Sequence, residues 1–125
     1  MKRILLIDSD PVTAGLSAKF LTNFNYEVEV ATTGKVGLDK LNTERYDLVL
    51  TDIELVGLGG FDVLKMMNKC FMDVPVFFFT SLDDPTTWIE ADSLGAKKLI
   101  SKRKDYINLP HIIDSFVYSS HDMVA

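Results

Sequence analysis

Four short apolar runs, each followed by a polar residue, constrain the fold of this chain more than any other feature of its sequence. A strand with one wet face alternates apolar and polar residues, whereas a continuous run is typical of a strand covered on both faces. Segments long enough for helices lie between the runs, and strands that alternate with helices indicate right-handed crossovers and a parallel sheet. The four runs are Ile4–Ile7, Leu48–Leu50, Val74–Phe79 and Lys98–Ile100.

A fifth strand and a first helix are predicted between the first two runs. Tyr26–Val30 alternates with period two, as a half-exposed strand does. The helix before it begins with an N-cap aspartate and a proline at residues 10–11. Its apolar residues recur at every fourth position, which predicts that Leu16, Phe20 and Phe24 form its buried face.

Four further helices follow from caps, glycines and apolar stripes. The second helix is predicted from about Thr33, with Val36, Leu38 and Leu41 facing the core. The predicted class is therefore α/β. The later helices are predicted around the stripe Phe61, Leu64 and Met67, from the cap Asp84 to Gly95, and from Asn108 onward.

The length of the chain, 125 residues, is about that of one domain. Apolar residues make up 47% of it, which is enough to close one core. No linker, repeat or low-complexity tract interrupts the alternation of strands and helices. A single domain over residues 1–125 is predicted.

Net charge, hydropathy and cysteine content argue against nucleic-acid binding, a membrane span and an internal disulfide. The formal net charge of −5 argues against direct binding to nucleic acid, whose backbone selects for lysine and arginine. The longest apolar run, Val74–Phe79, is too short to span a bilayer, and the N-terminal run lacks a signal-peptide cleavage site. We therefore expect a cytoplasmic protein. The single cysteine, Cys70, cannot form an internal disulfide, and its apolar neighbours Met66 and Met67 predict a buried, unreactive thiol.

Polar residues of matched chemistry stand where four predicted strands end. Asp8 follows the first strand, Asp52 the third, Thr80 and Ser81 end the fourth, and Lys102 follows the fifth. Any one of them has an ordinary explanation, because strand ends reach solvent. In an open parallel sheet, however, the carboxyl ends of the strands share one edge, and ligands bind there. The four positions together therefore predict a functional site.

These residue types fit phosphoryl transfer onto a carboxylate. An aspartate can attack phosphorus and form an acyl phosphate, which assigns the nucleophile to Asp52. Two neighbouring acids repel, and Mg²⁺ relieves that repulsion with one or two carboxylates, waters and phosphate oxygens. Asp8 is then a metal ligand, the Lys102 ammonium neutralises one phosphoryl oxygen, and the Thr80 hydroxyl donates a hydrogen bond to another.

At these residues the chain resembles the receiver domains of bacterial two-component systems, over nearly its whole length. The resemblance implies a flavodoxin-like three-layer sandwich with a five-stranded parallel sheet of order 2-1-3-4-5. It also implies a phosphoacceptor and not an enzyme in the usual sense. The matching segments, in order and at the spacing of the family, are Ile4–Pro11, Tyr46–Gly60, Phe61–Leu64, Val74–Ser81 and Gly95–Lys102.

The resemblance further implies ligands and partners. A histidine kinase or a phosphotransfer protein would phosphorylate Asp52, and Mg²⁺ would bind Asp8, Asp52 and the backbone carbonyl of Glu54. The face formed by the fourth helix, fifth strand and fifth helix would bind a downstream protein or a second copy of the chain.

Three departures from the family pattern keep a second hypothesis open. Ser9 replaces an acid that usually contacts the metal, and is itself a candidate ligand; Arg103 stands where proline is usual, and Leu99 where an aromatic switch residue is usual. These changes are compatible with a degenerate receiver that binds a partner without phosphorylation. A third alternative is an unrelated flavodoxin-like cofactor binder or hydrolase. It is disfavoured because the glycines in the 57–60 loop lack the spacing and position of a phosphate-binding loop.

Overall fold

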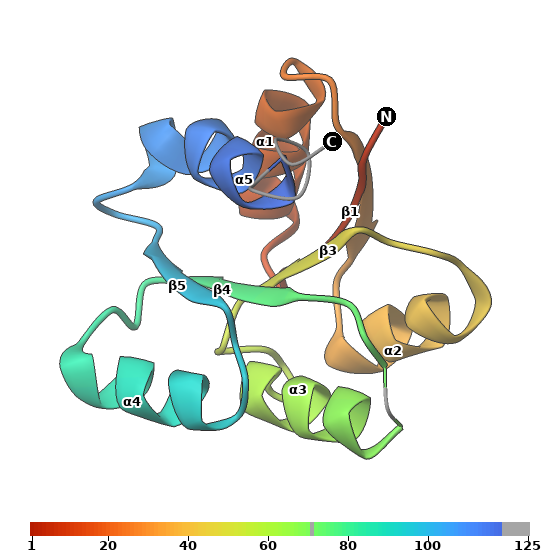
Figure 1. The fold of residues 1–125 in the computed structure, drawn as a ribbon, viewed down its shortest axis with the longest axis vertical. Helices are drawn as coiled ribbons and strands as arrows, with labels where there is room; N and C mark the ends of the chain where they lie inside the picture. The colour runs from red at the N-terminus through yellow and green to blue at the C-terminus, as the bar shows by residue number, and fades with distance from the viewer. Residues whose placement is uncertain (71, 119–125) are drawn as a thin grey trace.

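Five parallel strands form one sheet in the order β2-β1-β3-β4-β5, as predicted (Figure 1). The structure is a computed structural model that describes residues 1–70 and 72–118. Each strand is followed by a helix, so every connection crosses from one strand to a parallel one. The elements are β1 (Arg3–Ile7), α1 (Pro11–Thr22), β2 (Glu27–Ala31), α2 (Gly34–Thr43), β3 (Leu48–Thr51), α3 (Gly60–Lys69), β4 (Val76–Thr80), α4 (Pro85–Ser93), β5 (Lys98–Ser101), a 3₁₀ turn η1 (Tyr106–Asn108) and α5 (Leu109–Val117).

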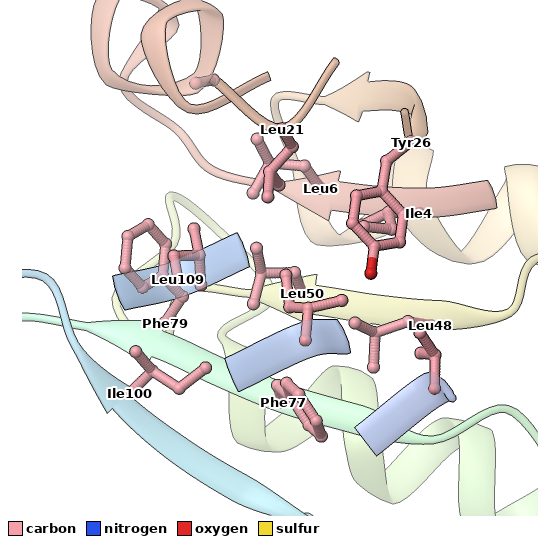
Figure 2. Close-up of a cluster of buried hydrophobic side chains, with 13 residues drawn as sticks. Ile4, Leu6, Leu21, Tyr26, Leu48, Leu50, Phe77, Phe79, Ile100 and Leu109 are labelled. Carbon is pink, nitrogen blue, oxygen red and sulfur yellow. The ribbon is translucent and has the colours of Figure 1, made fainter. Parts of the chain in front are cut away.

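Helices cover both faces of the sheet and make a three-layer sandwich. Helices α1 and α5 lie on one face, and α2, α3 and α4 on the other (Figure 1). Successive residues of a strand point to opposite faces. Phe77 and Phe79 accordingly pack beneath α1 and α5, whereas Phe78 packs against the other three helices. Figure 2 shows the core between the sheet and helices α1 and α5. Strands β1, β3 and β4 contribute fully buried side chains to it.

The predicted helix caps are present. The Asp10 carboxylate accepts from the Val12 backbone N–H at 3.1 Å and from the Thr13 hydroxyl, and so begins α1. Asp84 begins α4 in the same way, by accepting from the Thr87 backbone N–H. These bonds satisfy backbone donors that a helix leaves free in its first turn. The carboxylate of Asp10 therefore acts as the N-cap of α1, as predicted.

The predicted buried face of α1 is wrong by about one position. Leu16 is 61% exposed and Phe24 49% exposed, while the residues that face the sheet are Ala14, Ser17 and Leu21. The small side chains of Ala14 and Ser17 let the helix backbone approach the sheet closely. The larger apolar residues are displaced to the rim of the helix, where Phe20 packs on the Phe24 ring.

Close approach also explains the one wrong core residue in α2. Val36 is 41% exposed, whereas Leu38 and Leu41 pack inward as predicted. The buried residues of this helix are glycines, Gly34 and Gly37. A β-carbon on Gly37 would lie 2.5 Å from the Ile7 side chain, so the helix contacts the sheet through bare backbone.

The expectation of a buried cysteine is also wrong. Cys70 is the residue that ends α3, and its side chain is exposed. The apolar residue types around it led to the wrong prediction because Met66, one turn earlier, is itself 45% exposed. Within the described residues, no helix combines the length and apolar character needed to cross a bilayer.

Candidate functional site

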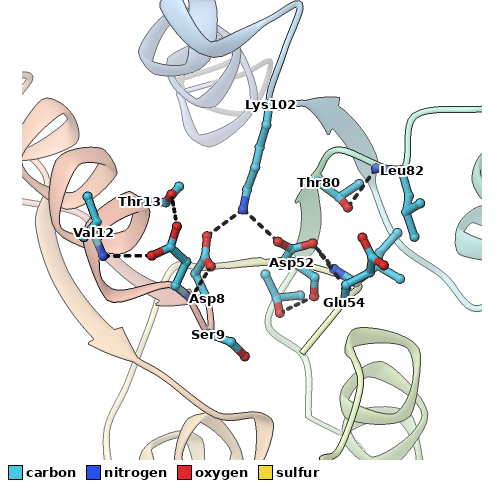
Figure 3. A network of polar contacts seen from close by, with 12 residues as sticks. Asp8, Ser9, Val12, Thr13, Asp52, Glu54, Thr80, Leu82 and Lys102 are labelled. Atoms are coloured by element: carbon cyan, nitrogen blue, oxygen red, sulfur yellow. Dashed lines mark hydrogen bonds and ion pairs between the residues drawn. The ribbon is translucent and has the colours of Figure 1, made fainter. Parts of the chain in front are cut away.

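Asp8, Asp52 and Lys102 meet in direct contact at the carboxyl edge of the sheet. The Lys102 ammonium lies 2.7 Å from an Asp8 carboxylate oxygen and 2.7 Å from an Asp52 carboxylate oxygen (Figure 3). These residues follow β5, β1 and β3, which are far apart in the sequence. The structure therefore brings together three of the four residues that were predicted from strand ends alone.

Strand register is what places these residues at one level. Ile7 pairs with Thr51 across β1 and β3, so the next residues, Asp8 and Asp52, emerge side by side. The Asp52 backbone N–H donates to the Ile7 carbonyl at 2.9 Å. Between β4 and β5, the Lys102 backbone N–H donates to the Thr80 carbonyl, also at 2.9 Å. The ladder of the sheet thus continues into the site and holds it in place.

Backbone donors hold both carboxylates. One oxygen of Asp8 accepts from the Asp10 backbone N–H at 3.0 Å, and its other oxygen accepts from Lys102. One oxygen of Asp52 accepts from the backbone N–H groups of Ile53 and Glu54 at 2.7 and 3.2 Å. A carboxylate offers about four lone-pair sites. Each acid therefore keeps acceptor capacity for a further ligand.

The Lys102 ammonium is held in its charged form. Burial disfavours the charge, but hydrogen bonds to Asp52 and Asp8 outweigh that effect and raise the pKa of Lys102 above its usual value. The side chain of Lys102 is 15% exposed. A cation in this place neutralises the repulsion between the two acids.

Thr80 ends β4 at the same edge, and its hydroxyl is bonded to the loop that follows. Its side chain is fully buried, and its hydroxyl oxygen accepts from the Leu82 backbone N–H at 3.1 Å (Figure 3). The hydroxyl therefore holds the loop after β4, and among residues 1–70 and 72–118 it donates to no acceptor. Its role as a donor to a phosphoryl oxygen stays a prediction.

Ser9 joins two loops of the site. Its hydroxyl oxygen accepts from the Val56 backbone N–H at 3.0 Å, which connects the loop after β1 to the loop after β3. Sequence reasoning treated Ser9 only as a weak substitute for a metal-binding acid and missed this bond. No local signal could have revealed it, because the two residues are far apart in the sequence.

The donor set fits Mg²⁺. Asp8 and Asp52 offer two carboxylates with spare lone pairs, and Mg²⁺ takes one or two carboxylates together with waters and phosphate oxygens. Within residues 1–70 and 72–118, no three histidine, cysteine, aspartate or glutamate side chains gather around one point. A metal here would therefore draw on two carboxylates, with the Glu54 carbonyl as the further predicted ligand.

Gly60, the first residue of α3, packs directly against the residue that carries the predicted nucleophile. A β-carbon there would overlap the Asp52 carbonyl oxygen and lie 2.8 Å from the Ile53 α-carbon. We expect Gly60→Ala to lower the free energy of unfolding by about 1–3 kcal/mol, the usual cost of overpacking. Urea denaturation followed by circular dichroism measures it.

Gly15→Ala is the matched control for Gly60→Ala. Gly15 lies inside α1, and a β-carbon there would meet no atom within 4 Å. Because alanine favours a helix over glycine, this change is expected to raise stability by up to about 1 kcal/mol. Equal stability of the two alanine variants would contradict the proposed contact between Gly60 and Asp52.

The sequence of the chain is similar to those of known proteins. The family model of the response regulator receiver domain matches residues 4–114. Among curated proteins, the chain is 31% identical over 116 residues to the transcriptional regulatory protein CrdR of Helicobacter pylori, covering 92% of the chain and 54% of that protein. It is 32% identical over 107 residues to the transcriptional activator protein IrlR of Burkholderia pseudomallei, covering 86% of the chain and 46% of that protein. The chain thus spans about half the length of these relatives.

Solved structures show the same fold. A CheY-like response regulator receiver domain protein from Methanospirillum hungatei superposes with a TM-score of 0.85 at 27% identity, with 94% of each chain covered. The response regulator protein TrrA from Thermotoga maritima, in complex with Mg²⁺ and BeF, gives a TM-score of 0.82 at 27% identity over 92% of this chain and 98% of that one. Sequence, fold and matched length lead to one conclusion. The chain belongs to the response regulator receiver domain family.

Proposed function

We propose that Asp52 accepts a phosphoryl group from a histidine kinase or a phosphotransfer protein, with the assistance of Mg²⁺. The observation that carries this proposal is the Lys102 ammonium, 2.7 Å from both Asp8 and Asp52 at the carboxyl edge of a parallel sheet. The largely buried Lys102 ammonium can bind an incoming phosphoryl group, and the two acids, which keep acceptor capacity, can bind a divalent cation.

In the proposed step an Asp52 carboxylate oxygen attacks the phosphorus atom. A new O–P bond forms as the bond from phosphorus to the donor breaks, and the leaving group departs with that electron pair. Lys102 neutralises charge on the phosphoryl oxygens, and Thr80 donates a hydrogen bond to one of them. Mg²⁺, held by Asp8, Asp52 and the Glu54 carbonyl, would supply further charge neutralisation when bound. The domain is itself phosphorylated in this step, so it acts as a phosphoacceptor and not as an enzyme of separate substrates.

Intact-mass measurement tests the proposal directly. The chain is incubated with Mg²⁺ and acetyl phosphate, and a fraction of it is expected to gain the mass of one phosphoryl group. The matched reaction with EDTA in place of Mg²⁺ is expected to show little or none. No adduct at any Mg²⁺ concentration would contradict phosphorylation of this chain.

The serine at position 9 is expected to make Mg²⁺ binding weak. Ser9→Asp adds a carboxylate beside Asp8 and is expected to tighten Mg²⁺ binding at least about tenfold, because an added charge close to a divalent ion is worth several kcal/mol before desolvation. Isothermal titration measures it. Ser9→Ala is the control, since it removes the bond to Val56 without adding charge. Equal Mg²⁺ affinity of the two variants would place residue 9 outside the metal site.

One observation favours a second candidate function. Because the Ser9 hydroxyl is bonded to Val56 and carries no charge, the site has one acid fewer than the family pattern. A degenerate receiver would bind its partner equally well before and after Asp52→Ala, and its Mg²⁺ affinity would be millimolar or weaker. Partner binding that depends on Asp52 would exclude this candidate.

The output surface we propose is the face of α4, β5 and α5. A groove of about 640 Å³ lies there, and its lining includes Trp88, Leu99 and Ile112. Ile89 on α4 is also 68% exposed. Phosphorylation would shift an equilibrium between two conformations of the domain. A downstream protein or a second copy of the chain would bind one of these conformations more tightly than the other.

We propose that the domain is cytoplasmic. We also propose that it makes no direct contact with nucleic acid, because its net charge of −5 opposes binding to an anionic backbone. Its curated relatives CrdR and IrlR are named as a transcriptional regulator and an activator, and the chain covers about half of each. DNA binding in such a protein would belong to a region outside the matched part.

A further inference from the structure

The Asp83 carboxylate bonds to the residues on both sides of Lys102. It accepts from the Ser101 hydroxyl at 2.6 Å and from the Arg103 guanidinium at 3.1 and 3.2 Å. Asp83 belongs to the loop after β4, three residues beyond Thr80. Its side chain is 14% exposed, whereas that of Arg103 is 65% exposed. We call Asp83, Ser101 and Arg103 the Asp83 clasp; the Arg103 guanidinium is its exposed part, and the Asp83 carboxylate is its largely covered centre.

The Asp83 clasp is completed by bonds that hold Ser101 on every side. The Ser101 hydroxyl accepts from the Lys104 backbone N–H at 3.1 Å while it donates to Asp83. The Ser101 carbonyl accepts from the Asp105 backbone N–H at 2.9 Å, and the Ser101 backbone N–H donates to the Asp105 carboxylate. Ser101 is 4% exposed. The turn that follows β5 is thus fixed at the residue before Lys102.

A fixed backbone matters at this position because lysine is a flexible side chain. Its four-carbon stem carries about 2 kcal/mol of rotamer entropy, and its ammonium is a point charge without directional preference. Contact with Asp8 and Asp52 at once requires the stem to start from one place. Small displacements of a charged group in such a site reduce rates strongly.

We propose that Asp83 is a positioning residue for the phosphoryl-accepting site, acting through Ser101 and Arg103 to hold the backbone of Lys102. The inference rests on the proposed function of Lys102. Asp83 also joins the loop that follows Thr80 to the residues on both sides of Lys102, and so adds a side-chain link to the backbone bond between Lys102 and Thr80. Its ionised state is secured, since the Ser101 hydrogen bond outweighs burial and, with the positive charges of Arg103 and Lys104, lowers the pKa of Asp83.

The test compares Asp83→Ala with Asp84→Ala. The neighbouring Asp84 caps α4 and has no bond to the turn after β5 among the described residues, so its loss costs stability without loosening Lys102. Asp83→Ala is expected to slow phosphorylation by acetyl phosphate about tenfold to a hundredfold, the range for a misplaced charged group. Asp84→Ala is expected to keep the wild-type rate. Arg103→Ala, which removes only the exposed part of the clasp, is expected to fall between them.

A spectroscopic readout separates positioning from stability and from the proposed function. The ¹⁵N–¹H signal of the Lys102 ammonium is expected to be resolved in the wild type and in Asp84→Ala, because two carboxylates protect it, and to broaden or vanish in Asp83→Ala. An unchanged Lys102 signal and an unchanged phosphorylation rate in a folded Asp83→Ala would overturn the inference. A wild type that forms no adduct, yet shows the Lys102 signal lost on Asp83→Ala, would instead contradict the proposed function and leave the Asp83 clasp intact.

Discussion

Replacement of Asp52 by asparagine is expected to abolish the phosphoryl adduct completely. The amide keeps the shape of the carboxylate and can still accept from the Ile53 and Glu54 backbone N–H groups through its oxygen. Asparagine cannot form an acyl phosphate, because the attack on phosphorus requires a carboxylate oxygen and a neutral amide is a poor nucleophile. Asp52→Ala is expected to give the same result by removing the group altogether.

The measurement is intact mass after incubation with Mg²⁺ and acetyl phosphate, with circular dichroism to establish that the variant is folded. Asp62→Asn is the control, because Asp62 is an exposed acid in the first turn of α3, close in sequence and outside the site. It is expected to keep the wild-type adduct. An adduct that persists in both Asp52 variants would move the phosphoryl acceptor to another residue and refute the proposed chemistry.

Replacement of Lys102 by methionine is expected to have the second largest effect, with opposite signs on two measurements. Methionine keeps most of the apolar stem and removes the ammonium that contacts Asp8 and Asp52. Phosphoryl transfer is expected to slow about 10²–10³-fold, the usual cost of removing one preorganised group that stabilises developing charge. Mg²⁺ affinity is expected to rise, because the two acids lose the cation that now neutralises their mutual repulsion.

Intact-mass measurements on samples quenched at successive times give the rate of phosphorylation, and isothermal titration calorimetry gives the Mg²⁺ affinity. Lys98→Met is the matched control: Lys98 begins the same strand, and its side chain is exposed at the opposite end. It is expected to change neither quantity. A Lys102→Met variant that loses rate and Mg²⁺ affinity together would indicate a general collapse of the site, and one with the wild-type rate would remove Lys102 from the mechanism.

The layered fold was predictable from residue types alone. Runs such as Ile4–Ile7 and Leu48–Leu50 are apolar on both faces, and only a sheet covered on both sides buries them. Caps such as Asp10 and Asp84 act within a few residues of themselves, so their effect is local and was confirmed. The order of the strands followed from the family resemblance, and the structure agrees with it.

The composition of the site was predictable for a related reason. Parallel strands end at one edge, and residues that follow paired strands emerge at one level, as Asp8 and Asp52 do. Sequence order and strand topology therefore sufficed to bring together Asp8, Asp52 and Lys102. The hydrogen-bond partner of Thr80 was not predictable, because it depends on the path of the loop after β4.

The sequence by itself determined which segments are strands and helices, and which polar residues stand at the functional edge, because both follow from short-range periodicity and from the geometry of a parallel sheet. Only the tertiary structure decided which face of α1 is buried, since small residues such as Ala14 and Ser17 set how closely the helix approaches. It also decided the bonds that loops make with distant parts of the chain, between Ser9 and Val56 and between Asp83 and Ser101 at the end of β5. Such bonds depend on the distance between two segments that are far apart in the sequence, which the packing of the whole domain sets and which no local pattern encodes.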